Sequence, residues 1–330
     1  LSPFQGLAPE RILEVVESAL GIRCSNLCRS YNSYINRVFE IADTSGNGMV
    51  VKFYRPGRWS AQALQDEHDF LLELADEEIP VLAPLHLQDG TTLGRYGDIF
   101  FAIFAKKGGR LIDEFTDELW LTLGRLLGRM HMVGARRLPK DRIRMHPADS
   151  TAGQLAFIRK SGLVPEDLLP RYQDLGEALI RTVQPLFAQA EMIRIHGDCH
   201  RGNLIHRPGE SLYLLDFDDM VIGPPVQDLW MLLPGPPEEC PVELDLLLEG
   251  YETFRPFDQA SLKLIEPLRA MRFIHYTAWC AHQVVEEGRT AVMVDFGTRT
   301  YWQQEIDDLH DQLHRIEQGP PPPQRMVDPF

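Results

Sequence analysis

The sequence predicts an α+β protein with two lobes, a small antiparallel sheet with one helix followed by a larger, mainly helical part. Short runs rich in β-branched and aromatic residues lie before residue 105, and long runs with helical spacing of apolar residues follow. The length of 330 residues is also enough for two domains. We therefore expect an N-terminal lobe over residues 1–105, a hinge near residues 102–107 and a C-terminal lobe over residues 106–330.

The elements of the first lobe follow from local patterns. Residues 35–42 and 49–54 are strand-like, and Asp43-Thr-Ser-Gly-Asn-Gly48 between them has the composition of a hairpin turn. Ser60 is a suitable N-cap for a helix over residues 61–75. A further apolar run over residues 99–105 predicts another strand of the same sheet.

The second lobe is mostly helical by the same criterion. Amphipathic spacing predicts helices over residues 117–133, 175–190, 267–283 and 301–316. A β-rich segment over residues 193–219 interrupts them. The basic residues between Arg136 and Arg144 are interpreted as a solvated turn, and the proline-rich stretch over residues 319–330 as an extended tail.

Composition excludes several classes of protein. Hydrophobic residues make up 44% and charged residues 25% of the chain, which is ordinary for a folded protein. No run approaches the ~18 apolar residues of a membrane span, and charged residues interrupt the first thirty positions, against a signal peptide. Five cysteines are an odd number and no disulfide framework. We expect a cytoplasmic protein with no membrane association, and a monomer because no heptad run requires a dimer.

The net charge of −15 argues against nucleic acid as a partner, because phosphate backbones are bound by clustered Lys and Arg. It is compatible with a cationic small molecule.

The β-rich segment carries the residues with recognisable chemistry. Its loop reads His196-Gly-Asp-Cys-His-Arg-Gly-Asn203, and a predicted hairpin over residues 204–215 then leads to Asp216. The hairpin folds the chain back, so Asp198, Asn203 and Asp216 are expected to converge. Their oxygens suit Mg²⁺ shared with substrate phosphates.

Each of these residues has an expected role in phosphoryl transfer. Asp198 precedes Asn203 by five residues, the spacing of a kinase catalytic loop, and its carboxylate would accept or orient the proton of the attacking hydroxyl. Asn203 would offer a neutral oxygen to the metal, and Asp216 would bridge metal and phosphates. His200 is open to a structural or a participating role, and Cys199 is interpreted as a packing residue.

The first lobe offers a complementary pair. Lys52 lies inside an apolar strand, which favours a charged partner or phosphate over an outward-pointing edge residue. Glu67 lies on the apolar stripe of the helix formed by Leu64, Leu71 and Leu74, so it is expected to face inward toward a cation, and Lys52 is the nearest candidate. His68 is expected at the border of that stripe.

No glycine-rich phosphate loop precedes the first strand. Asn32 and Ser33 stand at that position and could offer hydroxyl or backbone donors to phosphates, although a plain polar turn is the alternative.

Together these motifs resemble the aminoglycoside/choline kinase-type phosphotransferase superfamily and, within it, the bacterial stress response kinase A family (YihE/RdoA-type protein kinases). The narrower resemblance extends over nearly the whole chain. It is carried by Asn32-Ser-Tyr-Ile-Asn-Arg-Val38, Val51-Lys-Phe-Tyr-Arg-Pro56, Val226-Gln-Asp-Leu-Trp-Met-Leu-Leu233 and Ile265-Glu-Pro-Leu-Arg-Ala-Met-Arg272.

The resemblance implies a protein kinase-like fold, use of ATP with Mg²⁺, phosphorylation of Ser/Thr on proteins and a role in envelope or oxidative stress. It implies Asp198 as the catalytic base, with Asp216 as a further catalytic residue. It also implies Asn203 and Asp216 as magnesium ligands, and Ser33, Lys52 and Glu67 as ATP-site residues. Asp-Phe-Asp stands where ordinary protein kinases have Asp-Phe-Gly, and no Ala-Pro-Glu follows, which argues against their activation-loop switch.

Three other interpretations differ in class. A phosphotransferase for an aminoglycoside, choline or amino alcohol would use the same loop, because fold does not decide the acceptor. A non-catalytic ATP-binding protein would be expected to have lost Lys52 or one of the loop residues. A metal hydrolase built on His196, Asp198, His200 and Asp216 would leave Lys52 and Glu67 without a purpose.

Overall fold

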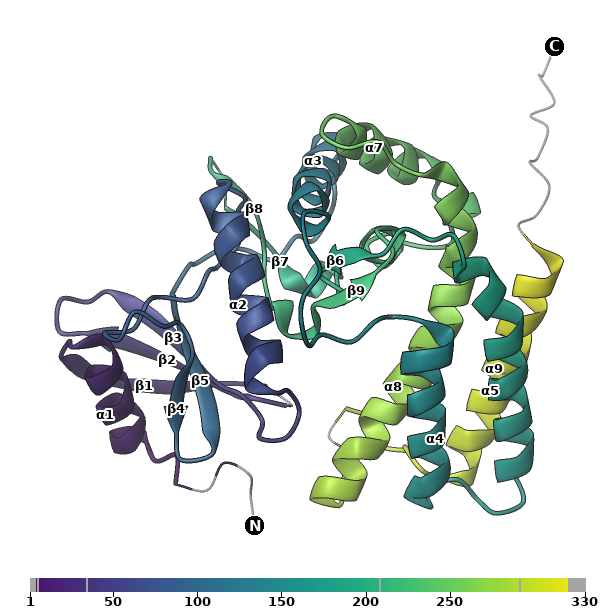
Figure 1. The fold of residues 1–330 in the computed structure, drawn as a ribbon, viewed down its shortest axis with the longest axis horizontal. Helices are drawn as coiled ribbons and strands as arrows, with labels where there is room; N and C mark the ends of the chain where they lie inside the picture. The colour runs from purple at the N-terminus through teal and green to yellow at the C-terminus, as the bar shows by residue number, and fades with distance from the viewer. Residues whose placement is uncertain (1–3, 5, 34, 208, 291, 320–330) are drawn as a thin grey trace. The chain divides into compact units, whose positions relative to one another are not determined.

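The computed structural model describes residues 4, 6–33, 35–207, 209–290 and 292–319, so the predicted tail beyond Gly319 lies outside the described residues. Its first part is an antiparallel sheet, as the sequence predicts (Figure 1). The strands are hydrogen-bonded in the order β1 (Cys24–Tyr31), β2 (Arg37–Asp43), β3 (Gly48–Phe53), β5 (Ile99–Ala105) and β4 (Gly94–Tyr96).

Strand alternation decides which way the site lysine points. Met49, Val51 and Phe53 of β3 belong to one buried cluster with Ile12 and Val16 of α1 (Pro9–Leu20), so α1 covers that face of the sheet. Successive side chains of a strand point to opposite faces. Lys52 therefore lies on the face opposite α1.

The helix after β3 forms where the pattern predicts it. α2 (Ala61–Asp76) begins after Ser60, whose hydroxyl accepts a hydrogen bond from the Ala63 N–H at 3.0 Å. The apolar stripe is buried, and Glu67 is buried within it. The expected border position of His68 is wrong, because its ring is fully buried and contacts the Tyr54 hydroxyl and the Thr92 hydroxyl.

The remaining elements are mainly helical. Two short two-stranded sheets, β6–β9 and β7–β8, follow the first helices of this part. The bounds are α3 (Asp117–Gly134), α4 (Ala152–Ser161), α5 (Leu169–Val183), β6 (Ile193–Ile195), β7 (Leu204–Arg207), β8 (Ser211–Leu214), β9 (Val221–Gly223), α6 (Val226–Trp230), α7 (Pro241–Glu252), α8 (Ile265–Glu287) and α9 (Arg299–Gln318).

By its internal contacts the chain forms two compact units, each made of separate stretches. The first comprises Leu1–Arg142, Ile193–Ile222 and Val242–Pro256, and the second comprises Ile143–Met192, Gly223–Pro241 and Phe257–Phe330. The first unit thus contains the large sheet, α2 and the segment that carries Asp198, Asn203 and Asp216. In the second, α4, α5, α8 and α9 lie next to one another (Figure 1). They share one hydrophobic core around Tyr172 and Trp302.

Within the described part of the chain, no helix is both long enough and apolar enough to cross a membrane.

Candidate active site

The loop after β6 is shaped by a buried histidine and a glycine. The His196 Nδ1 accepts a hydrogen bond from the Asp198 backbone N–H at 3.3 Å, and its Nε2 lies 2.7 Å from the Leu215 carbonyl oxygen. The ring proton is therefore on Nε2, and the histidine ties the loop to the end of β8. Gly197 has φ +85°, and a Cβ there would lie 2.3 Å from the Asp219 carbonyl oxygen, so only glycine fits.

Asn203 is held by the same loop. Its side-chain Nδ2 donates to the Asp198 carbonyl oxygen at 3.0 Å, which leaves the side-chain oxygen as the atom suited to a cation. The Leu215 N–H donates to the Asn203 carbonyl oxygen at 2.9 Å. The hairpin of β7 and β8 thereby brings the residue preceding Asp216 against Asn203, as its position in the sequence led us to expect.

Lys52 reaches across to the end of that hairpin. Its Nζ lies 2.9 Å from Asp216 Oδ1 and 3.1 Å from Asp218 Oδ1. Burial alone would lower the pKa of Lys52, but the carboxylates of Asp216 and Asp218 raise it well above its ordinary value. Lys52 is consequently a fixed positive charge in the first unit.

The ion pair that the sequence suggested between Lys52 and Glu67 is not the one that forms. Glu67 instead accepts from Arg142 at 2.7 Å, and both side chains are buried. The reason is geometric, because two carboxylates of the Asp-Phe-Asp segment meet Lys52 directly while the Arg142 guanidinium reaches Glu67. Burial raises the pKa of Glu67 to about 7, although Lys52 and Arg142 act in the opposite direction.

Arg142 was missed by sequence reasoning. The interpretation of residues 136–144 as a solvated turn is wrong for this residue, whose side chain is fully buried. Besides Glu67, its guanidinium donates to the carbonyl oxygens of Ala63 and Asp218. The available signal was the row of acidic residues along α2 that such a basic run could meet.

Asp218 was also missed as a central residue. It is 5% exposed and receives the Asn36 side-chain amide at 3.0 Å, and Arg58 forms ion pairs with both Asp218 and Asp219. The signal was the third position of Asp-Phe-Asp, where a carboxylate replaces the glycine of ordinary kinases.

The other predicted site residues are placed as follows. Ser33 lies half-buried in the connection between β1 and β2. The Asp198 side chain is 27% exposed and the Asp216 side chain is 58% exposed. Asp216 also has φ +58° and ψ +70°, an uncommon backbone conformation for a residue with a side chain.

The donor set suits a divalent cation shared with phosphates. Across the described ranges, no three His, Cys, Asp or Glu side chains gather as a metal site. An amide oxygen from Asn203 and the accessible carboxylate of Asp216 are hard donors, too few for a protein cage. Mg²⁺ typically binds through one or two carboxylates plus substrate phosphates and water, so the residues present fit that ion.

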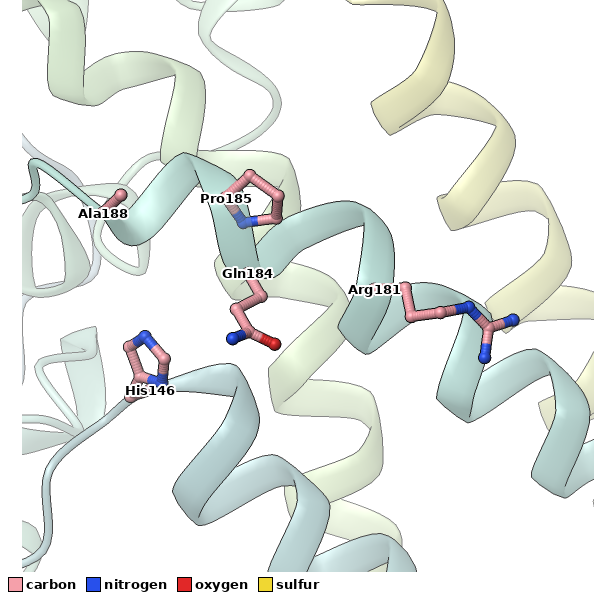
Figure 2. Close-up of a pocket in the computed structure, with 5 residues that line it drawn as sticks. All are labelled: His146, Arg181, Gln184, Pro185 and Ala188. Atoms are coloured by element: carbon pink, nitrogen blue, oxygen red, sulfur yellow. The ribbon is translucent and has the colours of Figure 1, made fainter.

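A cavity of about 360 Å³ lies in the second unit, at the end of α5. The His146 ring and the Gln184 amide face one another across it, whereas the Arg181 side chain extends away (Figure 2). None of the predicted site residues lines this cavity.

Comparison with known proteins gives a consistent result. Residues 28–265 match the phosphotransferase enzyme family. The chain is 35% identical over 318 residues to stress response kinase A of Escherichia coli strain K12, covering 96% of each chain. It is likewise 35% identical over 321 residues to a Salmonella typhimurium protein named serine/threonine protein kinase RdoA, again covering 96% of each.

Solved structures share the fold. An amicoumacin kinase solved with AMP-PNP, Ca²⁺ and amicoumacin aligns with a TM-score of 0.74 at 18% identity, covering 94% of this chain and 95% of that one. Choline kinase LicA from Streptococcus pneumoniae aligns with a TM-score of 0.61 at 17% identity, covering 92% and 98%. The predicted fold, an N-terminal antiparallel sheet followed by a mainly helical part, is confirmed.

Proposed function

Because the chain belongs to the phosphotransferase enzyme family and, within it, to the stress response kinase A family, we propose that it is a serine/threonine protein kinase. It transfers the γ-phosphate of ATP to protein hydroxyls, its own included, with Mg²⁺, and promotes survival of envelope or oxidative stress from the cytoplasm. The observation that carries the proposal is similarity over 96% of the chain to a relative named a serine/threonine protein kinase.

Some of the site residues act on the acceptor hydroxyl and others bind the nucleotide. Asp198 takes the proton of the attacking hydroxyl, and its loop is fixed by His196 and Gly197. Lys52 provides a buried positive charge to the phosphates. When nucleotide binds, the Lys52 ammonium leaves Asp216 and contacts the phosphates instead. Ser33 contributes to the ATP site of the proposed N-terminal lobe. Glu67, which is buried against Arg142, acts on that site through its charge near Lys52.

Asn203 and Asp216 would hold the magnesium ion, which when bound neutralises charge on the phosphates as the transferred group leaves. Asp218 keeps its contact with Lys52 throughout, so the lysine is not left without a counter-ion.

A second candidate function has support of its own. Solved neighbours in this fold are kinases of small molecules, including an amicoumacin kinase and a choline kinase. The net charge of −15 would favour a cationic acceptor. The acceptor must therefore be tested directly.

The test follows label from γ-phosphate-labelled ATP with Mg²⁺. The purified chain is incubated alone, with a basic protein such as histone, and with choline and a panel of aminoglycosides. We expect label on protein serine or threonine, and at least a ~100-fold loss in Asp198→Asn, as for removal of a general base. Asp311→Asn, an exposed carboxylate on α9, is the matched control.

Label that passes only to a small molecule would overturn the protein-kinase proposal and leave the site assignment intact. Undiminished transfer by Asp198→Asn would overturn the role of Asp198.

A further inference from the structure

His200 is a polar side chain of the loop between β6 and β7, and the proposed function gives it no role. It lies two residues after Asp198, and its side chain is 38% exposed. Its two ring nitrogens face different groups. The Nδ1 accepts a hydrogen bond from the Gly202 backbone N–H at 3.0 Å, and the Nε2 lies 3.4 Å from Asp198 Oδ2.

The first contact determines what the second can do. Since Nδ1 is an acceptor, the ring proton is on Nε2, which is the nitrogen near the Asp198 carboxylate. The imidazole thus carries a donor 3.4 Å from one oxygen of the proposed base. Such contacts are often long without substrate and shorten in the reacting complex.

The loop around His200 is built to keep the ring there. A Cβ on Gly202 would lie 2.8 Å from the His200 Cε1, so glycine at this position makes room for the imidazole. The His200 N–H donates to the Asp198 carbonyl oxygen at 3.0 Å, and the Asn203 N–H donates to the His200 carbonyl oxygen at 2.9 Å. Backbone and ring together fix His200 between the proposed base and the proposed metal ligand.

We propose that His200 is a positioning residue, which holds the Asp198 carboxylate by donating Nε2–H to Oδ2 and so sets the direction in which it receives the acceptor proton. The inference rests on the proposed phosphotransfer, whichever acceptor is used. In that step the hydroxyl oxygen bonds to the γ-phosphorus, and its proton passes to Asp198. The bond from the γ-phosphorus to the β,γ-bridging oxygen breaks, and ADP leaves with the electron pair.

A merely structural alternative is that His200 serves only as the cap of the short helical turn Arg201–Asn203. Two substitutions separate the roles. In His200→Asn, the amide can still accept from the Gly202 N–H but is too short to reach Asp198. In His200→Gln, the amide nitrogen stands where Nε2 stood and can donate to Asp198, while the cap is lost.

The experiment measures kcat and KM for ATP with the acceptor that the wild-type chain uses, together with AMP-PNP affinity and Tm. We expect kcat of His200→Asn to fall at least ~10-fold, because a misplaced base is costly even when binding is intact. KM for ATP, AMP-PNP affinity and Tm should stay close to wild type. His200→Gln should recover kcat to within ~3-fold of wild type, since the donor to Asp198 is restored.

Gly202→Ala is an independent variant that displaces the ring without altering the histidine, and it should also lower kcat. His310→Asn, an exposed histidine of α9, controls for histidine removal in general. Full activity of His200→Asn with loss in His200→Gln would assign only the cap and overturn the proposal, as would equal losses in both. The wild-type acceptor decides the proposed function separately, so the two failures are distinguishable.

Discussion

At the scale of single residues, Asp218 is the carboxylate that contacts two largely buried cations of the first unit. It contacts Lys52, Arg58 and Asn36, which come from β3, the β3–α2 connection and the turn before β2. Burial would raise the pKa of Asp218, but Lys52 and Arg58 hold it well below the ordinary value of an aspartate. Its charge therefore stabilises two cations that have little access to water.

Replacing the Asp218 carboxylate by a neutral group should lower the free energy of unfolding. In Asp218→Asn the shape is kept, but Lys52 and Arg58 lose a buried counter-ion, and we expect a loss of about 3 kcal/mol in unfolding free energy. Asp219→Asn is the matched control, since its side chain is 35% exposed and contacts Arg58 alone among the described cations. For that variant we expect less than about 1 kcal/mol. Thermal unfolding of both variants checks this, and equal shifts in Tm would contradict it.

Sequence reasoning at this scale found the residue types but not the pairing. Periodicity placed Glu67 inward, and burial of Glu67 confirms it. Its partner could not be predicted, because Arg142 is 75 residues away in the chain. Only the tertiary approach of residues 136–142 to α2 decides that Arg142, and not Lys52, meets this carboxylate.

At the scale of elements, helices with a clear apolar periodicity were predicted, whereas a strand without an alternating pattern was missed. The helix predicted over residues 61–75 is α2 (Ala61–Asp76), and that over residues 117–133 is α3 (Asp117–Gly134). β1 was missed because Cys-Ser-Asn-Leu-Cys-Arg-Ser-Tyr does not alternate between polar and apolar. It is an edge strand with no fully buried residue, and pairing with β2 rather than its own pattern defines it.

The contact between α8 and α9 contains a polar group that no proposed step uses. Thr277 donates to Glu305 Oε1 at 2.7 Å and also lies 2.7 Å from the Tyr301 hydroxyl. Burial raises the pKa of Glu305 to about 7, against the smaller effect of the Thr277 hydrogen bond, while Asp308 on the same helix adds to the rise. The helix pair is therefore sensitive to pH near neutrality.

The direction of this pH dependence follows from the linkage between proton binding and folding. The folded-state pKa of Glu305 lies above the unfolded value, so its contribution to stability is complete below about pH 4.5 and is lost as pH rises through about 7. The loss amounts to at most ~1.4 kcal/mol for each pH unit. Glu305→Gln lacks this loss. The Tm of Glu305→Gln should rise relative to wild type between about pH 5 and about pH 8.

Glu317→Gln, at an exposed position of the same helix, is the control for this series. A Tm difference between Glu305→Gln and wild type that stays constant with pH would show that Glu305 is ionised throughout.

At the scale of the whole molecule, neither compact unit is a continuous piece of chain. The first needs residues 193–222 in addition to residues 1–142. Phe70 of α2 packs against Phe217 with ring centroids 5.9 Å apart, and Leu214 pairs with Val81. The early part of the chain thus depends on a segment that follows it by more than fifty residues.

A fragment of residues 1–142 should therefore fail to form a stable unit. It would expose Phe70 and leave Lys52 without Asp216 and Asp218, an uncompensated buried charge. We expect circular dichroism to show helix without a cooperative thermal transition, compared with a sharp transition for the full chain. A sharp transition with a near-ultraviolet signal in the fragment would contradict this dependence.

The backbone of Asp216 has an evolutionary consequence. Glycine would adopt its φ of +58° more easily than aspartate, by about 1 kcal/mol. The loss of its carboxylate would still leave Lys52 paired with Asp218. The backbone conformation alone would thus favour glycine here, and the role proposed for Asp216 in phosphotransfer would account for the aspartate. A descendant of this chain released from its catalytic duty should lose Asp216 before it loses Asp218.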